Sequence, residues 1–460
     1  MLKRLFVLVF VFCLISVFGF QGSSYAGDPD WRTKQDAAFE KLDVEPGDII
    51  TRENDLAKAE TLLPKYLYKW FARGDIMDLE IRDCKYDLSH DDYWRKASEE
   101  NRGKYAIDEK GSIIDIATGK YPVFVNGEPF PADTIDMAGG SKSASKVMYN
   151  KLLVKYRTGN FKFNHIVLWI DFKGGLERIV EAYWATYFYW GRKGGPVKNP
   201  ENLEMRDMTI AVAPFDMAGT AQLSLRTLGT KDDQVYAYVP AIRRVKRLSG
   251  ANRSDPYMGS EAIFDDAYGW NGLNTSMDWT YKGKRTALLW LPEWVSEYSF
   301  QMTKQPDGSW EGMTPSMNYG FETPGSTCAT WAATNAVWVP REFYVVEGYP
   351  RDPYYSSGIT QYWVDVATHY ICYKWSHDKA GEFWKGVCLQ PCHVRWGDDN
   401  SYGLLGQVSD MICDDKLQHA TNIKGGCGKV NGSSELKIIF DDPKVTPRML
   451  TVEKMKMWTK

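Results

Sequence analysis

The chain has 460 residues and a formal net charge of −3, with 44% hydrophobic and 14% aromatic residues. This acidic balance argues against a nucleic-acid binder, which presents a basic surface. After the first 20 residues, no stretch is long and apolar enough for a membrane-spanning helix, which needs about 20 residues. The 18 Trp and 27 Tyr residues are typical of a β-rich core and also of an apolar ligand groove, and both interpretations stay open.

The N-terminus predicts a cleaved secretory signal peptide over residues 1–26. Lys3 and Arg4 precede the uncharged run from Leu5 to Phe20, and Ser24-Tyr25-Ala26 supplies the small side chains of a cleavage site. A run of this length is short for a bilayer-spanning helix. We therefore expect a protein that is exported to the periplasm, or associated with the outer membrane, of a Gram-negative envelope.

Helical spacing is found near the start of the mature chain and again before its middle. Leu56, Ala59 and Leu62 recur at helical intervals, and Pro64 begins a second short helix, so helices are expected over about 50–73. A further amphipathic helix is expected over residues 144–156, and Gly139-Gly140-Ser141 reads as a helix start rather than a phosphate loop. We expect these helices to cover a sheet.

Most of the remaining chain predicts β-strands. Two long β-prone stretches, 161–172 and 176–190, flank Gly174-Gly175 and predict a hairpin. Further strands are expected at 208–212, 222–225, 235–239, 242–248, 277–281, 286–291, 338–347, 361–366, 369–375 and 382–388. Such a succession with short turns favours an antiparallel sheet or open barrel.

No break in composition divides the mature chain, so residues 27–460 are expected to form one β-domain. Residues 304–325 are rich in Gly, Pro, Ser and Asn and predict a loop or lid.

The cysteines indicate a stapled C-terminal segment. Four of them, Cys388, Cys392, Cys413 and Cys427, fall within 388–427, and an exported protein meets an oxidising compartment in which disulfides form. Their pairing stays open. Cys388-Leu-Gln-Pro-Cys392-His393 is one residue longer than a haem-attachment motif, which leaves a redox or haem protein as a less favoured alternative.

The common catalytic frameworks are missing from the sequence. The mature chain contains no Gly-x-Ser-x-Gly, no Gly-x-x-x-x-Gly-Lys-Ser/Thr, no His-Glu-x-x-His and no dinucleotide fingerprint. The adjacent Asp265 and Asp266 read as a solvated loop, because neighbouring residues of an extended chain point in opposite directions. We expect no catalytic residue, no metal and no cofactor.

The basic run from Arg243 to Arg247 predicts a strand with charge on both faces. One face could hold anionic headgroups or a partner, and solvated charges with cross-strand ion pairs are the alternative.

Three stretches are distinctive together: Tyr238-Val-Pro-Ala-Ile-Arg-Arg-Val-Lys-Arg247, Arg253-Ser-Asp-Pro-Tyr-Met-Gly259 and Asp265-Asp-Ala-Tyr-Gly269. With them the chain resembles domain-of-unknown-function family 1329, a family of exported proteins similar to outer-membrane lipoprotein-sorting carriers of the LolA/LolB type. The first stretch followed by Arg253-Ser-Asp-Pro256 is the most specific part of the resemblance. The resemblance implies a mainly β fold: a strongly curved antiparallel sheet that forms a half-open LolA/LolB-like barrel, with covering helices, around an apolar cavity. The matching residues include Arg253, Ser254, Asp255, Gly259, Asp266, Tyr268 and Gly269.

From these patterns we expect a non-catalytic periplasmic carrier for a lipid or another hydrophobic molecule. An inner-membrane permease or an outer-membrane protein is implied as a partner by the resemblance. The alternative is a structural adaptor of an outer-membrane or transporter complex whose cavity is filled by its own side chains. The expected ligand-binding residues are Trp169, Tyr183, Trp184, Tyr187, Tyr189 and Trp190 on the long hairpin, with Arg243, Arg244 and Arg247 at the rim.

Overall fold

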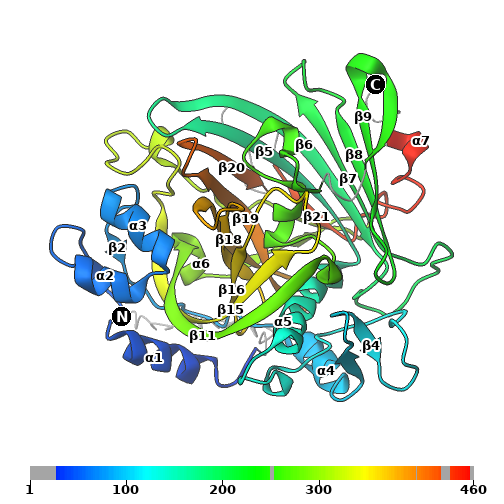
Figure 1. Cartoon of the computed structure of the whole chain (residues 1–460), viewed down its shortest axis with the longest axis horizontal. Helices are drawn as coiled ribbons and strands as arrows, with labels where there is room; N and C mark the ends of the chain where they lie inside the picture. The colour runs from blue at the N-terminus through cyan, green and yellow to red at the C-terminus, as the bar shows by residue number, and fades with distance from the viewer. Residues whose placement is uncertain (1–26, 249–252, 400, 426–435, 456–460) are drawn as a thin grey trace, which may run out of the picture.

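One large antiparallel sheet organises the computed structural model, which describes residues 27–248, 253–399, 401–425 and 436–455 (Figure 1). The expected signal peptide and Cys427 lie outside these ranges. The main strands are β5 (Asn160–Asp171), β6 (Gly175–Phe188), β7 (Leu203–Ala213), β8 (Ala221–Thr227), β9 (Gln234–Val239), β10 (Arg244–Leu248), β11 (Met277–Pro292), β15 (Ala336–Pro350), β16 (Thr360–Asp365), β17 (Ile371–His377), β18 (Phe383–Trp396), β19 (Tyr402–Asp414), β20 (His419–Gly425) and β21 (Ile438–Phe440).

The strands pair in a single continuous row. From one end it runs β10, β9, β8, β7, β6, β5, β20, β19, β18, β17, β16, β15 and β11, and every one of these neighbouring pairs is antiparallel. The outermost strands are β10, which pairs with β9, and β11, which pairs with β15. The sheet curls around the middle of the molecule without closing, so the expected half-open, mainly β architecture is confirmed.

Short strands extend the sheet beside β5. The first residues of β5 pair with β21, which pairs in turn with β14 (Trp310–Gly312), and β14 pairs with β13 (Thr303–Lys304). β12 (Phe300–Gln301) forms a two-residue parallel pairing with β18. Two small separate sheets pair β1 (Ile49–Ile50) with β2 (Leu79–Glu80) and β3 (Tyr105–Ile107) with β4 (Ile113–Asp115).

The long hairpin forms where the sequence predicts it. β5 and β6 are joined by Phe172, Lys173 and Gly174, and Gly175 has a φ of 81°, a left-handed conformation that favours glycine. The expected strands 277–281 and 286–291 form one strand, β11, with a register shift between Tyr281 and Gly283. β19, β20 and β21 were not among the expected strands.

The helices lie mostly at the N-terminal side of the chain. They are α1 (Trp31–Leu42), α2 (Leu56–Leu62), α3 (Lys65–Arg73), α4 (Asp92–Glu100), α5 (Ser141–Val154), α6 (Glu293–Glu297) and α7 (Val452–Met455). α2, α3 and α5 correspond to the expected helices, whereas α1 and α4 were not expected. Within the described ranges, no helix has both the length and the apolarity needed to cross a membrane.

Cross-strand pairing defines two faces of the sheet. Phe163 of β5 pairs with Trp184 of β6 and with Ile438 of β21, and these side chains share what is called here the inner face. Tyr183 and Tyr187 alternate with Trp184 and lie on the outer face, where they pack with the C-terminal segment. Helix α5 and the segment 253–272 cover the inner face, so much of the hollow of the sheet is filled by the chain itself.

The segment 304–325 does not stand free as an expected lid would. Its residues Trp310–Gly312 form β14, and Tyr319 is fully buried. Lys424 of β20 forms an ion pair with Glu322, with the nitrogen 2.6 Å from a carboxylate oxygen. Lys424 pairs across the sheet with Ile166, which alternates with the inner-face residues of β5, so this part of the segment covers the outer face.

Candidate functional site

An apolar cavity of about 100 Å³ lies between α5 and the inner face of the sheet. We call it the inner cavity. Its walls come from segments that are far apart in the chain. They include Val154, Phe161, Phe163, Trp184, Tyr268, Cys392, Val394, Leu404, Ile438 and Phe440. Aliphatic and aromatic groups on nearly every side make it a space that hydrocarbon can fill.

Two further spaces continue from the inner cavity toward the edge of the sheet. A middle cavity of about 50 Å³ shares Phe163 and Trp184 with the inner cavity. An outer cavity of about 250 Å³ shares Thr209, Tyr257 and Phe264 with the middle one. The outer cavity lies against β8 and β9 and contains charged groups at its wall. The inner, middle and outer cavities therefore form a row that runs from an apolar interior to a more polar rim.

Two buried lysines, Lys151 and Lys155, are also among the residues that line the inner cavity. The Lys155 ammonium group donates to Asn271 Oδ1 at 2.5 Å, and that of Lys151 donates to the carbonyl of Trp270. Burial and the nearby Arg226 guanidinium hold the pKa of both lysines well below its usual range. Both nitrogens are thus used to fix the segment 270–271, and they add little polarity to the cavity wall.

The family-like residues of the segment 253–272 form a buried ionic network beside the cavities. Arg253 contacts Asp265, with Nε to Oδ1 at 2.7 Å, and also Asp233, which pairs with Arg226 at 2.9 Å. Asp266 pairs with the buried Lys374. The expectation that Asp265 and Asp266 form a solvated loop is therefore wrong, because both side chains are buried and each is paired with a different cation.

Other residues of the same motif shape the turn or the cavity wall. Tyr268 lines the inner cavity, Asp255 lines the outer cavity, and Ser254 Oγ accepts from the Ser356 backbone N–H at 3.0 Å. Gly269 has a φ of 78°, and a Cβ there would lie 2.7 Å from the side chain of Ile371. This close approach explains why glycine is required at that turn.

The residues expected to bind ligand are divided between two faces. Trp184 lines the inner and middle cavities, and its indole N–H donates to Asp207. Trp169 shares the inner face and packs near Tyr257 and Met258 without lining any of the three cavities. Tyr183 and Tyr187 lie on the outer face, as strand alternation requires.

The end of the expected hairpin lies away from the cavities. Tyr189 follows β6, and its hydroxyl accepts from Arg206 Nε at 3.1 Å. Trp190 is fully buried and stacks on Tyr121, with 5.4 Å between the ring centroids. Neither residue lines any of the three cavities.

The aromatic residues that sequence reasoning missed are Phe161, Phe163 and Phe440. The first two belong to the alternating stretch Phe161-Lys-Phe163-Asn-His165, whose period of two assigns them to one face. This signal was available, but it could not say which face lies over a cavity. Phe440 of β21 pairs with Phe161 of β5. This contact joins distant parts of the chain, so no local sequence pattern predicts it.

Arg243, Arg244 and Arg247 lie on the hairpin between β9 and β10, away from the inner cavity. All three are exposed, and Arg243 adopts a left-handed conformation with a φ of 49° at the turn. None of the three lines the inner, middle or outer cavity, so the structure does not bring them together with Trp184.

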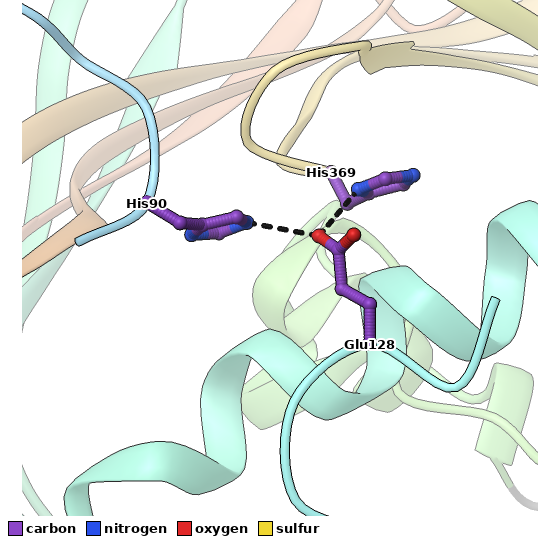
Figure 2. Close-up of side chains that lie close together, drawn as sticks. All are labelled: His90, Glu128 and His369. Atoms are coloured by element: carbon purple, nitrogen blue, oxygen red, sulfur yellow. Dashed lines mark hydrogen bonds and ion pairs between the residues drawn. The ribbon is translucent and has the colours of Figure 1, made fainter. Parts of the chain in front are cut away.

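A compact cluster of His90, Glu128 and His369 is the one group in the described part of the chain whose side chains could together hold a metal ion (Figure 2). Both histidines point at the same carboxylate oxygen, with His90 Nε2 at 3.1 Å and His369 Nδ1 at 2.8 Å. All three side chains are buried.

Each imidazole ring has a second nitrogen on its far side, away from Glu128, and the neighbours of these nitrogens determine what the cluster can bind. Arg157 Nη1 lies 3.2 Å from His90 Nδ1, and Asn150 Nδ2 lies 3.2 Å from His369 Nε2. Both neighbours are donors, because the Asn150 amide is oriented by its two bonds to the backbone of Phe130. Each ring must accept on its far side, so the nitrogen that faces Glu128 carries the proton. The imidazole nitrogens that face Glu128 therefore do not offer lone pairs to a metal.

The expected disulfides are not formed among the described cysteines. Cys388, Cys392 and Cys413 are free, buried thiols of β18 and β19. Their cross-strand partners are Met411, Gly406 and Gly386, respectively, so none faces another cysteine. Cys388 and Cys392 are separated by four residues of one strand, roughly 13 Å, whereas a disulfide needs Cα atoms within about 7 Å.

The positions of the side chains along β18 also argue against the alternative of a redox or haem protein. His393 points to the side of β18 opposite Cys392 and its Nδ1 lies 2.6 Å from Ser299 Oγ. Burial lowers the pKa of His393 to about 3. Cys388, Cys392 and His393 therefore do not converge on a single group.

The fold and these cavities define a curved-sheet protein with an apolar interior. A family model described as protein of unknown function (DUF1329) matches residues 49–414, and the chain belongs to this family. This confirms the resemblance found in the sequence. No curated protein matches the chain.

Solved structures with a similar chain path include three from different bacteria. A putative outer membrane lipoprotein-sorting protein domain from Vibrio parahaemolyticus is 14% identical, with a TM-score of 0.45 over 69% of this chain and 100% of that chain. A DUF1329 family protein from Desulfovibrio piger is 12% identical, with a TM-score of 0.44 over 68% of this chain and 98% of that chain. A LolA superfamily protein from Nitrosomonas europaea is 10% identical, with a TM-score of 0.36 over 67% of this chain and 98% of that chain.

Proposed function

We propose that this protein is an exported binding protein that holds the hydrocarbon part of a lipid, or of another hydrophobic molecule, and performs no chemistry on it. The supporting observation is the inner cavity, whose wall is formed by side chains such as Phe161, Val394 and Phe440. The periplasm is the compartment that the N-terminal sequence predicts. Transfer between envelope membranes is the corresponding role.

The size of the cavity limits how the ligand is held. A dry engineered cavity of about 150 Å³ accepts benzene, so the inner cavity, of about 100 Å³, takes a short piece of an alkyl chain. Each methylene that it buries contributes about 0.8 kcal/mol before ordering costs. A longer chain continues into the middle cavity once the side chains of Phe163 and Trp184, which both spaces share, move aside.

A second candidate function is a structural adaptor whose interior is closed to ligands. The filling of the sheet by α5 and the segment 253–272 favours it. In that case the cavities are packing defects with no occupant, and filling them changes stability alone.

Gly406 offers a test that separates these two functions. It lines the inner cavity, and a Cβ built on it would lie 3.9 Å from Cys392 Sγ, an ordinary contact distance. Gly406→Leu should fill the cavity without unfolding the protein. The measurement is titration of purified protein with a fluorescent fatty acid, together with the unfolding temperature of each variant.

The carrier function predicts a graded loss of affinity. Gly406→Leu displaces about two methylenes of ligand, or about 1.6 kcal/mol, which weakens binding roughly tenfold, and Gly406→Ala has a smaller effect. Tyr187→Ser, on the outer face, is the control and should leave the affinity unchanged. Equal affinity in wild type and Gly406→Leu, or no binding by either, would support the adaptor instead.

A further inference from the structure

The most exposed apolar side chains near the cavities lie at the tips of two neighbouring hairpins. β7 and β8 are joined at residues 214–220, and β9 and β10 at residues 240–243. Because Ala221 pairs with Tyr238, both tips lie at the same end of the sheet (Figure 1). Phe215 is 98% exposed at the first tip, and Ile242 is 46% exposed at the second.

The second of these hairpins carries a group of cations. Arg243, Arg244, Lys246 and Arg247 are all exposed on the second hairpin. The nearest acidic side chain on the first tip, Asp216, is engaged by Arg178 of β6. Together these two hairpin tips form what we call the docking edge: Phe215 and Ile242 with the four cations of β10 and its turn.

We infer that the docking edge attaches this protein reversibly to the surface of an anionic lipid bilayer. A fully exposed phenylalanine at a narrow tip can bury its ring among lipid headgroups and acyl chains without a preformed partner pocket. The cations gain from the negative surface potential of such a bilayer, by an amount that corresponds to roughly a fivefold change in affinity for each Arg or Lys at the surface. Two projecting tips present little continuous area, which favours a deformable surface over a rigid protein face.

The docking edge lies close to the outer cavity. The outer cavity is lined by Thr220, the last residue of the first tip, by Ala221 and Gln222, which follow it, and by Ala237, close to the second tip. A bilayer held at the docking edge would thus lie beside the polar end of the row of cavities. The attachment goes beyond ligand binding and stands on the exposure and charge of the tips alone.

Vesicle flotation of the full mature protein tests the inference. The probes are vesicles of phosphatidylglycerol mixed with phosphatidylethanolamine, compared with vesicles of phosphatidylcholine alone. Wild-type protein should float with the anionic vesicles, and 0.5 M salt should release it, since exposed charges are screened within about 10 Å at 0.1 M salt and more strongly above. Phe215→Ser should weaken binding several-fold, and Arg243→Gln, Arg244→Gln and Arg247→Gln combined should abolish it.

Matched variants elsewhere control for exposure and net charge. Tyr354→Ser removes another exposed aromatic side chain, 83% accessible, and Lys41→Gln, Lys104→Gln and Lys120→Gln together remove three exposed cations. Both should bind vesicles like wild type. The inference is overturned if wild type ignores anionic vesicles, if it binds phosphatidylcholine equally well, if the control variants lose as much binding, or if the tips cross-link to a protein while ignoring vesicles. Fatty-acid affinity in solution should be unchanged in Phe215→Ser, because Phe215 lines none of the three cavities. Failure of vesicle binding and failure of ligand binding are therefore separate results.

Discussion

At the residue scale, burial favours the neutral form of three histidines, His165, His393 and His90. His165 of β5 lies in the wall of the middle cavity and stacks on Phe163, with 5.5 Å between the ring centroids. Burial lowers the pKa of His165 to about 4 and that of His393 to about 3. His90 is shifted in the same direction by burial, although Glu128 opposes the shift. These residues make the folded protein sensitive to acid.

We predict that this sensitivity falls when His165 is replaced by phenylalanine. Between pH 6.5 and pH 4 the unfolded chain protonates His165 and the folded protein does not, so the free energy of unfolding decreases as the pH falls through this window. At 1.36 kcal/mol for each pKa unit, His165 accounts for about 3 kcal/mol of the loss at pH 4. Urea unfolding of wild type and His165→Phe at pH 7, 5.5 and 4.5 should show the shallower dependence in the variant. Parallel curves for the two proteins would contradict the assignment.

At the same scale, the sequence predicted that aromatic side chains line a cavity, but it did not predict which of them do so. Trp184 lines the cavities because its neighbours in β6 and β5 set the face, and an alternating pattern carries that information. It does not say which of the two faces is hollow, so Tyr183 and Tyr187 were grouped with Trp184. The buried ion pairs of Asp265 and Asp266 depend on Arg253 and Lys374, and Lys374 is 108 residues from Asp266, beyond the reach of local patterning.

At the element scale, β18 and β19 show why the spacing of cysteines in the sequence does not predict disulfides. Both strands are central in the sheet, and the register places each of their cysteines opposite a residue that is not cysteine. Burial raises the pKa of Cys392 to about 12 and those of Cys388 and Cys413 well above the usual thiol range. Such thiols are inert in the folded protein.

Their burial and raised pKa values predict that these three thiols do not react before the protein unfolds. In a Cys427→Ser variant without the signal peptide, a thiol reagent should leave Cys388, Cys392 and Cys413 unmodified until the protein unfolds. Modification is read by mass spectrometry of peptides, with and without denaturant. A reducing agent should not change the unfolding temperature of this variant. A disulfide-linked peptide joining any two of these three cysteines would contradict the prediction.

The segment 253–272 is the second element that decides the site. Its backbone N–H at Glu261 donates to Thr421 Oγ1 at 3.0 Å, and the carbonyl of Glu261 accepts from Lys385 at 2.9 Å. With the ionic network of Arg253, these contacts hold the segment on the inner face. Loss of one partner of a buried pair costs about 3 to 5 kcal/mol, so the segment is a rigid part of the cavity wall.

At the scale of the whole molecule, the strand succession predicted an antiparallel sheet or open barrel, and the resemblance to the family implied that it is half-open. The order in which the strands pair could not be predicted from the sequence. β5 is followed in the chain by β6, yet its other edge pairs with β20 and β21, more than 240 residues later. This long-range pairing brings Phe440 opposite Phe161 and closes the inner cavity. Local periodicity predicts strands and hairpins, whereas the cavity arises from contacts between distant strands.

The central claim is that the inner cavity holds hydrocarbon. The most direct measurement is a crystal structure of the mature protein with a fatty acid that carries bromine at its terminal carbon, with bromine located by anomalous diffraction. We predict a bromine peak among Phe161, Val394 and Phe440, and its absence in Gly406→Leu under the same conditions. Ordered bromine only on the outer surface, with the inner cavity empty or closed by its own side chains, would contradict the account.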